Sequence, residues 1–326
     1  MSDYLPAEVI LEILQRLPVK SLVRFRSVCK TWNTLISHPS FISTHLQTSL
    51  SNNTPFLLLK CKKKRKRNYF LHHDNDGFDE FKPLQFPVFC SVLDTQVLGS
   101  CHGLICLDVF PNGFLFFIFW NPSIHKYISL PWPSISHDVR LNFGFGFDSR
   151  TNDYKLVIVG VEKDGTWIQP YLFSLNENCW KRVNAVPPNY AFVSVFGIPL
   201  PFVNGAVHWL GYQKRNNGGH SRAILGFNLS AEEFLVIGLP ESLIGLNRSR
   251  LSAMNGESSI AVLRKNGEVL LHVAKGEMAS LNLNCQQLEP HGVVVGDSLN
   301  SVDGSYVESL VLLDKGVNVP NMSYKF

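Results

Sequence analysis

LPAEVILEILQRLPVKSLVRFRSVCKTWNTLISHPSFISTHL, residues 5–46, is the stretch that decides how this chain begins to fold. Pro6 suits the first turn of a helix, where its missing N–H is no loss, and Pro18 cannot continue one. The first helix is therefore predicted to end near Arg16. A second short helix is predicted over 21–25 and a third over about 28–37, where Pro39 ends it.

The first predicted helix is more apolar than a single core-facing stripe requires. Ile10, Ile13 and Leu14 share one face, and Val9 and Leu11 flank it on either side. Three short helices in about forty residues scarcely bury a core of their own. The excess apolar surface must be covered either by a partner or by the rest of the chain, and the pattern alone leaves both open.

The order of residues in this stretch resembles an F-box. The matching pieces are Leu5-Pro6-x-Glu8, Ile13-Leu14-x-x-Leu17-Pro18-Val19-Lys20-Ser21-Leu22, Arg24-Phe25-Arg26, Val28-Cys29-Lys30-x-Trp32 and Leu35-Ile36-x-x-Pro39-x-Phe41. The wording RLPVKSLVRFRSVCKTW, residues 16–32, is similar to the large plant family in which an F-box-associated interaction domain follows the F-box. The resemblance implies docking to a Skp-type adaptor and, through it, to the cullin and RING subunit of an SCF-type ubiquitin ligase.

We assign adaptor docking mainly to the excess apolar arc, although some of its residues must also hold the helices together. The predicted adaptor-binding residues are Leu5, Pro6, Val9, Ile10, Leu22, Phe25, Val28 and Trp32.

The charge of the chain is concentrated in one run. The formal net charge is +4, but seven of the 30 basic residues lie in Lys60–Arg67, so the remainder has 23 basic against 26 acidic residues, or −3. The globular parts are therefore not a nucleic-acid-binding surface. The run itself is open to two interpretations: a solvated hairpin tip offset by the acidic segment 72–80, or a nuclear-import signal.

The cysteines and the apolar runs indicate in which compartment the protein resides and whether it binds a metal or cofactor. Seven scattered cysteines without C-x-x-C spacing predict reduced thiols in the cytosol or nucleus, and Cys101 and Cys106 are expected to be buried free thiols. His72-His73 with Asp74 and Asp76 lacks a further ligand, so no metal or cofactor is predicted. We expect no signal peptide, and the run 114–120 is too short to cross a membrane.

Beyond residue 84 the pattern predicts antiparallel strands. Short apolar runs are broken by Asn-Gly at 112, 204, 217, 255 and 266 and by Asp-Gly at 76, 164 and 303, dipeptides that tolerate the positive φ of tight hairpin turns. Three stretches, 117–131, 171–187 and 224–240, repeat a strand, a turn opened by Asn, a second strand and a closing proline. A spacing near 50 residues indicates propeller blades, with room for about five, and a β-sandwich is the alternative.

This second half also resembles the plant F-box-associated domain. The matching pieces are 99–106 (GSCHGLIC), 120–123 (WNPS), 143–149 (FGFGFDS), 151–155 (TNDYK), 202–209 (FVNGAVHW) and 306–310 (YVESL). The family usually continues after Leu251–Ala253 with a Trp-containing segment, whereas 255–275 lacks Trp and Tyr and looks shortened. A hairpin is therefore expected to be missing there.

The predicted organisation is α+β: a three-helix F-box over 1–46, a linking segment with the basic run and first strands over 47–83, and a mostly antiparallel, β-propeller-like all-β domain over 84–326. Within the linking segment, a polar linker is predicted over 47–55. Ser149 stands where a G-x-G-x-x-G loop needs its third glycine, and nucleophile, zinc and P-loop motifs are missing from the sequence. We therefore expect a non-catalytic substrate-recognition subunit that is cytoplasmic or nuclear, with a target protein of unknown identity. A binding module acting outside the ligase, or an oxidase-like propeller enzyme, are the alternatives.

Overall fold

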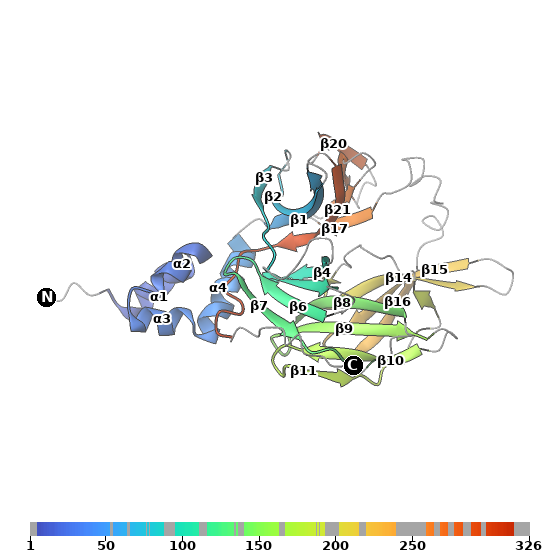
Figure 1. The fold of residues 1–326 in the computed structure, drawn as a ribbon, viewed down its shortest axis with the longest axis horizontal. Coiled ribbons are helices and arrows are strands. Elements are labelled where there is room, and N and C mark those ends of the chain that lie inside the picture. Colours follow the sequence, from blue (N-terminus) through green and yellow to red (C-terminus); the bar gives the residue numbers. More distant parts are fainter. Residues whose placement is uncertain are drawn as a thin grey trace.

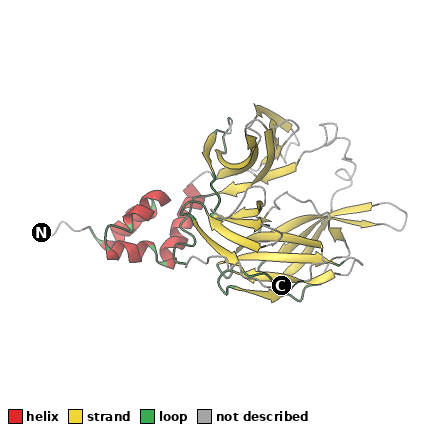
Figure 2. Cartoon of the chain, in the orientation of Figure 1, coloured by secondary structure: helices red, strands yellow, loops and turns green. Residues whose placement is uncertain are grey.

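The computed structural model consists of helices at one end and small antiparallel sheets at the other (Figure 1). It describes residues 5–315, apart from 53–54, 64–65, 76, 78, 88–94, 111–115, 134, 136–139, 163–166, 187, 189, 193–201, 215–219, 239–258, 264–267, 273–276, 283–287 and 295–297. The helices and the strands occupy separate parts of the molecule (Figure 2). The predicted α+β organisation, helices first and an all-β domain after them, is confirmed.

Within these residues the chain forms four helices, one more than predicted: α1 (Ala7–Gln15), α2 (Val19–Phe25), α3 (Lys30–Ile36) and α4 (Pro39–Asn52). Pro39 does end the third helix, but it also begins the fourth, because a proline is tolerated in a first helical turn. The expectation of a polar linker over 47–55 is therefore wrong for 47–52. Phe41, Ile42 and Leu46 of α4 are buried, so packing rather than composition makes this polar segment helical.

The described strands form five antiparallel sheets. The first contains β1 (Phe56–Lys63), β2 (Lys66–His73), β3 (Glu80–Pro83) and β21 (Ser298–Tyr306). The second contains β4 (Thr95–Cys101), β5 (Leu104–Val109), β6 (Phe116–Asn121) and β7 (Lys126–Leu130); the third contains β8 (Arg140–Asp148), β9 (Asp153–Val161), β10 (Trp167–Ser174) and β11 (Cys179–Arg182). The fourth contains β12 (Ala191–Phe192), β13 (Phe202–Val203), β14 (Ala206–Lys214), β15 (His220–Asn228) and β16 (Glu233–Gly238); the fifth contains β17 (Ser259–Leu263), β18 (Glu268–His272), β19 (Glu277–Asn282) and β20 (Leu288–Val294).

The sheets are arranged as propeller blades, as predicted, and not as a sandwich. Strands β17, β21, β4, β8 and β14, one from each sheet, contact one another in that order. The last strand, β21, pairs with β1, with Phe56 opposite Tyr306, so one blade joins the two ends of the domain. The strands β1–β3, which the sequence analysis assigned to the linking segment, are thus part of this blade.

The three predicted repeats fall on equivalent places in three blades. Each spans the last two strands of its sheet; Asn121 ends β6 and Asn228 ends β15, whereas Asn176 lies in the turn between β10 and β11. The Asn204-Gly205 turn between β13 and β14 has positive φ at both residues, 50° and 77°. Asp303-Gly304 was expected in a hairpin turn but lies inside β21, at an irregularity of its pairing with β1.

Two further expectations are corrected. The segment 255–275 does not lack a hairpin, because Ser259 pairs with His272 and Leu263 with Val269 in β17 and β18. The basic run lies at the end of the β1–β2 hairpin, where Lys63 pairs with Lys66 and residues 64–65 lie outside the described residues, whereas the sequence interpretation set it beside the acidic segment 72–80. That segment follows His73, at the opposite end of β2.

A buried ion pair fixes the third blade to the fourth. The Asp148 carboxylate is 2.7 Å from Nζ of Lys155, which also donates to the carbonyl of Leu229. Thr151 and Ser230 donate hydrogen bonds to the same carboxylate. Burial raises the pKa of the Asp148 carboxyl, but these hydrogen bonds outweigh it and hold that pKa well below its ordinary value.

The same two blades approach closely at the glycines of β8. A Cβ at Gly144 would lie 2.6 Å from the side chain of Val207 in β14, and one at Gly146 would overlap the ring of Phe202. The glycines of the motif Phe143-Gly-Phe-Gly thus allow the neighbouring blade to pack closely on β8.

A second buried network fixes the C-terminal segment, residues 306–315, to the second blade. Nδ2 of Asn121, which is fully buried, donates to the carbonyls of Ser309 at 2.9 Å and Val311 at 2.8 Å. Its Oδ1 accepts hydrogen bonds from the Tyr306 hydroxyl and the N–H of Ser123. The asparagine of the Trp-Asn-Pro-Ser motif therefore holds the Tyr-Val-Glu-Ser-Leu motif in place.

We predict that Asn121→Ala lowers the free energy of unfolding by about 3 kcal/mol, because it leaves several buried polar groups without partners. Urea unfolding followed by tryptophan fluorescence measures the loss. Asn176→Ala is the matched control: Asn176 occupies the equivalent turn but is exposed, so a change of less than about 1 kcal/mol is expected. Equal losses in the two variants would contradict this assignment.

Asp148→Asn is predicted to cost about 3 kcal/mol at neutral pH, because it removes the carboxylate 2.7 Å from the buried Lys155 ammonium and leaves only that of Glu232, at 3.8 Å. A carboxyl whose folded-state pKa is depressed contributes stability above its unfolded pKa, near 4, and that stability is lost as the pH falls toward the folded value. The difference between the two proteins should therefore shrink below about pH 4. Unfolding measured across this range checks it, and a constant difference would disprove the ionic origin.

Candidate functional site on the N-terminal helices

The four helices pack around buried apolar side chains. Leu14 of α1, Leu22 of α2 and Ile36 of α3 are buried and meet Phe41 and Leu46 of α4 in one hydrophobic cluster. Nε2 of the buried His45 lies 2.9 Å from the carbonyl of Leu17, next to the proline that ends α1. Burial lowers the pKa of His45, so the ring is neutral and donates this bond.

Apolar side chains remain exposed on these helices. The exposed fraction is 57% for Leu5, 42% for Val9, 46% for Ile13 and 62% for Val28. Val9 and Ile13 are four residues apart in α1, so they lie on one face, whereas Leu5 precedes the helix and Val28 lies between α2 and α3. We call these four residues the apolar face. Exposed large side chains of this kind, gathered on one module, mark an interaction surface.

The eight predicted docking residues divide into three groups. Leu5, Val9 and Val28 belong to the apolar face, and Pro6 is also exposed. Ile10, Phe25 and Trp32 are half-buried against the core, with the rings of Phe25 and Trp32 5.4 Å apart. Leu22 is fully buried and holds the helices together, so it offers no surface to a partner.

One residue of the apolar face was missed. Ile13 was placed with the core because it shares a face with Leu14 in the simple 3.6-residue pattern. It is four residues after Val9, however, and the exposed stripe follows that spacing. The wide apolar arc of α1 already indicated that one of its sides would be exposed. Which side faces inward depends on how α4 packs against the helices, and the sequence pattern does not show this.

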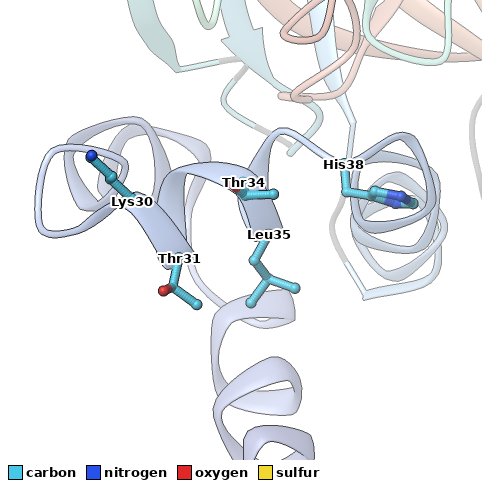
Figure 3. Close-up of a pocket in the computed structure, with 5 residues that line it drawn as sticks. All are labelled: Lys30, Thr31, Thr34, Leu35 and His38. Carbon is cyan, nitrogen blue, oxygen red and sulfur yellow. The ribbon is translucent and has the colours of Figure 1, made fainter.

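An open hollow lies beside α3, lined by Lys30, Thr31, Thr34, Leu35 and His38 (Figure 3). Leu35 points from α3 toward a neighbouring helix, and Nδ1 of His38 is 2.7 Å from the hydroxyl of Ser40 at the start of α4. Four of its five lining residues are polar, but apolar atoms form most of its surface. The hollow is open to solvent and is not an enclosed ligand pocket.

The C-terminal segment lies between the helices and the blades (Figure 1). Leu310, Val311, Leu312 and Leu313 are buried in the same continuous cluster as Leu14 and Phe41 of the helices and Phe117 and Phe119 of the second blade. Nζ of Lys126, in β7, donates to the carbonyls of Leu313 and Lys315 at 2.8 Å. Burial lowers the pKa of Lys126, and the charge of Arg26, in the turn between α2 and α3, lowers it further. This turn of the helical module therefore lies near β7.

Two edges of the β domain can now be distinguished. The helix-side edge contains the strand ends at Cys101, Asp148 and Tyr306: the Ser100 hydroxyl donates to the carbonyl of Ser305, and the Tyr154 hydroxyl to that of His102. The far edge contains the other ends of the same strands, at Thr95, Arg140 and Ser298. The connections that leave β5, β7 and β9 start at this far edge.

Few of the described residues have side chains that could act in catalysis or bind a metal. Cys101 and Cys106 are buried free thiols, as expected, and burial raises the pKa of both. His72 is buried whereas His73 is exposed, and Asp76 lies outside the described residues. The described part of the chain contains no group of three or more metal-ligating side chains. Among the same residues, no helix is long and apolar enough to span a membrane.

The fold consists of a helical module and a propeller-like domain that share one hydrophobic cluster. The F-box domain model matches residues 3–44, and the F-box associated beta propeller domain model matches residues 56–277. The chain belongs to this family of F-box proteins with an F-box-associated propeller domain.

Curated relatives are plant proteins. An F-box/kelch-repeat protein of Arabidopsis thaliana is 28% identical over 71% of this chain and 64% of its own length. A putative F-box protein of the same plant is 30% identical over 77% of this chain and 65% of its own length. The F-box protein CPR1 of Arabidopsis thaliana is 30% identical over 74% and 62%, respectively. The chain thus spans just under two thirds of the length of these relatives.

We predict that Leu310→Ser loosens the helices from the blades, because Leu310 is fully buried in the core that they share. Limited proteolysis should then cut faster between α4 and β1, and the free energy of unfolding should fall by about 3 kcal/mol. The control is Lys315→Ser, whose contribution to this contact is its main-chain carbonyl, which serine retains. Unchanged cleavage in Leu310→Ser would show that the segment does not hold the helices.

Proposed function

We propose that this chain is the substrate-recognition subunit of an SCF-type ubiquitin ligase. In this role the helices bind a Skp-type adaptor, which links them to a cullin and a RING subunit, and the β domain holds a target protein. The chain itself is not catalytic, because the transfer of ubiquitin belongs to other subunits. The observation that carries the proposal is the apolar face of an F-box that shares one core with a propeller-like domain.

The exposed apolar side chains support adaptor binding. A Leu or Ile side chain that passes from exposed to buried contributes roughly 1.5–3 kcal/mol. The apolar face offers two such anchors, Leu5 and Ile13, together with the valines Val9 and Val28, and the half-buried pair Phe25 and Trp32 adds aromatic surface. Each 1.4 kcal/mol gained by burying them would raise the adaptor affinity tenfold.

The arrangement of the two modules supports target recruitment. The helices contact the helix-side edge of the blades through the C-terminal segment, so the far edge faces away from the adaptor. Connections between strands tolerate variation in length and sequence, and they carry binding residues in many scaffolds. A target held at the far edge would therefore sit at a fixed distance from the adaptor.

Co-purification with a Skp-type adaptor and a cullin tests the proposal. The wild-type full-length chain should bring down both, and Leu5→Ser with Ile13→Ser should reduce adaptor affinity at least about thirtyfold. Both residues are exposed, so the melting temperature should not change. Val186→Ser, at a side chain 86% exposed in the β domain, is the matched control and should bind like wild type.

Two outcomes would contradict the proposal. Undiminished adaptor binding by the double variant would show that the apolar face is not the docking surface. Binding of adaptor without cullin would favour a protein-interaction module that acts outside the ligase.

A further inference from the structure

The helices α2, α3 and α4 carry cations but no acidic residue. The sequence contains no Asp or Glu between Glu12 and Asp74, and the carboxylate of Glu12 already pairs with Arg16, 3.5 Å away. Lys20 and Arg24 are exposed at positions i and i+4 of α2, where like charges repel each other. The side chains of these three helices therefore cannot neutralise the positive charge of α2.

The hydroxyl of Ser27 is exposed in the turn between α2 and α3, close to these cations. The Ser27 N–H donates to the carbonyl of Arg24 at 3.1 Å, so the last turn of α2 continues to this serine. Side chains at such an i, i+3 spacing are neighbours, with about 5–6 Å between their Cβ atoms. Arg26 directly precedes the serine, and Lys30 follows it as the first residue of α3.

The cations around Ser27 have few partners of their own. Nε of Arg26 donates to Oδ1 of Asn33 at 3.0 Å, which is a neutral acceptor. Within the part of the chain that the structure describes, neither Arg24 nor Lys30 forms an ion pair. An anion attached to Ser27 would thus meet three cations that no acidic side chain of the helices neutralises.

We propose that Ser27 is a phosphorylation site for a serine kinase that recognises basic residues, and that its phosphorylation releases the adaptor. In this reaction Oγ of Ser27 attacks the γ-phosphorus of ATP and forms the new O–P bond. The bond between that phosphorus and the β–γ bridging oxygen breaks, ADP leaves, and the hydroxyl proton passes to the catalytic base of the kinase. The phosphate then has three acceptor oxygens beside Arg24, Arg26 and Lys30, an arrangement that forms charge-assisted hydrogen bonds.

The effect on adaptor binding rests on the proposed function. Val28, the next residue, is 62% exposed and belongs to the apolar face. A phosphoserine carries a charge of about −1.5 to −2 at pH 7, and it must lose water when a partner covers Val28. The cations that bind the phosphate would hold it at the docking surface, so the adaptor affinity should fall.

The binding test compares the full-length chain with and without phosphoserine incorporated at position 27 during translation. Calorimetric titration with a purified Skp-type adaptor should show at least tenfold weaker binding to the phosphorylated chain. The matched control is phosphoserine at Ser149, which is exposed in the turn between β8 and β9, outside the helices, and should leave the affinity unchanged.

Two results would overturn the regulation of adaptor binding. One is equal affinity of the two forms at position 27. The other is a lower melting temperature of the phosphorylated form, which would attribute the weaker binding to unfolding. An unmodified chain that does not bind the adaptor would instead contradict the proposed function, so the two failures are distinguishable.

Phosphorus NMR tests the role of the cations. Nearby positive charge favours the dianion, so the second pKa of phosphoserine 27 should lie below its ordinary value near 6. Arg24→Gln with Lys30→Gln should return this pKa toward 6, whereas Arg140→Gln, an exposed cation of β8, should not change it. A pKa unaffected by the double substitution would disprove the cluster. Weaker adaptor binding by the unphosphorylated double variant would assign the cations to the adaptor and overturn the proposal as well.

The catalytic subunit of cyclic-AMP-dependent protein kinase, which selects serines preceded by arginine, is the probe for the modification itself. With ATP it should phosphorylate Ser27 of the full-length chain, located by mass spectrometry of its peptides, and Arg24→Gln should slow this at least tenfold. Ser40 is also exposed but has no Lys or Arg among the three residues before it, so it should remain unmodified. No phosphate on Ser27, or equal rates at the two serines, would contradict the assignment.

Discussion

The contact between the helices and the β domain depends on the hydrogen bonds of one buried side chain, that of Asn121. Its amide reaches two carbonyls of the C-terminal segment, and its oxygen accepts the hydroxyl of Tyr306, the last residue of β21. One residue thereby ties the turn of the second blade to the end of the first. Without these bonds the segment would leave buried carbonyls unpaired, and its four apolar residues could not remain between the helices and the blades.

This joint has a consequence for function. Packing joins the helices to the β domain. Helix α4 ends at Asn52 and β1 begins at Phe56, and the C-terminal segment packs against both modules. An adaptor bound to the apolar face and a target bound at the far edge would therefore keep a fixed relation to each other. In a ligase built this way, the geometry of the chain would select which target lysines come within reach.

The motifs of the β domain gain a physical meaning from their contacts. Gly144 and Gly146 allow β14 and Phe202 to approach β8, and Asp148 follows them with a carboxylate that receives four donors, Lys155 among them. Trp-Asn-Pro-Ser and Tyr-Val-Glu-Ser-Leu lie nearly 190 residues apart and are two halves of one network. The residues that carried the resemblance to the family are thus mainly those that hold blades together, which is why they say little about the target.

Local patterns determined much of this protein: the first three helices from prolines and apolar spacing, the turn at Asn204-Gly205 from its dipeptide, and the blades from the spacing of Asn121, Asn176 and Asn228. The Asn-Gly pairs at 112, 217, 255 and 266 and the Asp-Gly pair at 164 lie outside the described residues. Local patterns could not determine what depends on contacts distant in sequence. The polar segment 47–52 is helical because α4 packs on the core, Leu22 is buried while Ile13 is exposed, and Asp303-Gly304 lies within a strand because β1 pairs beside it. The distance between Lys66 and the acidic segment that follows His73 likewise depends on the strand, because residues close in sequence lie at opposite ends of the extended β2.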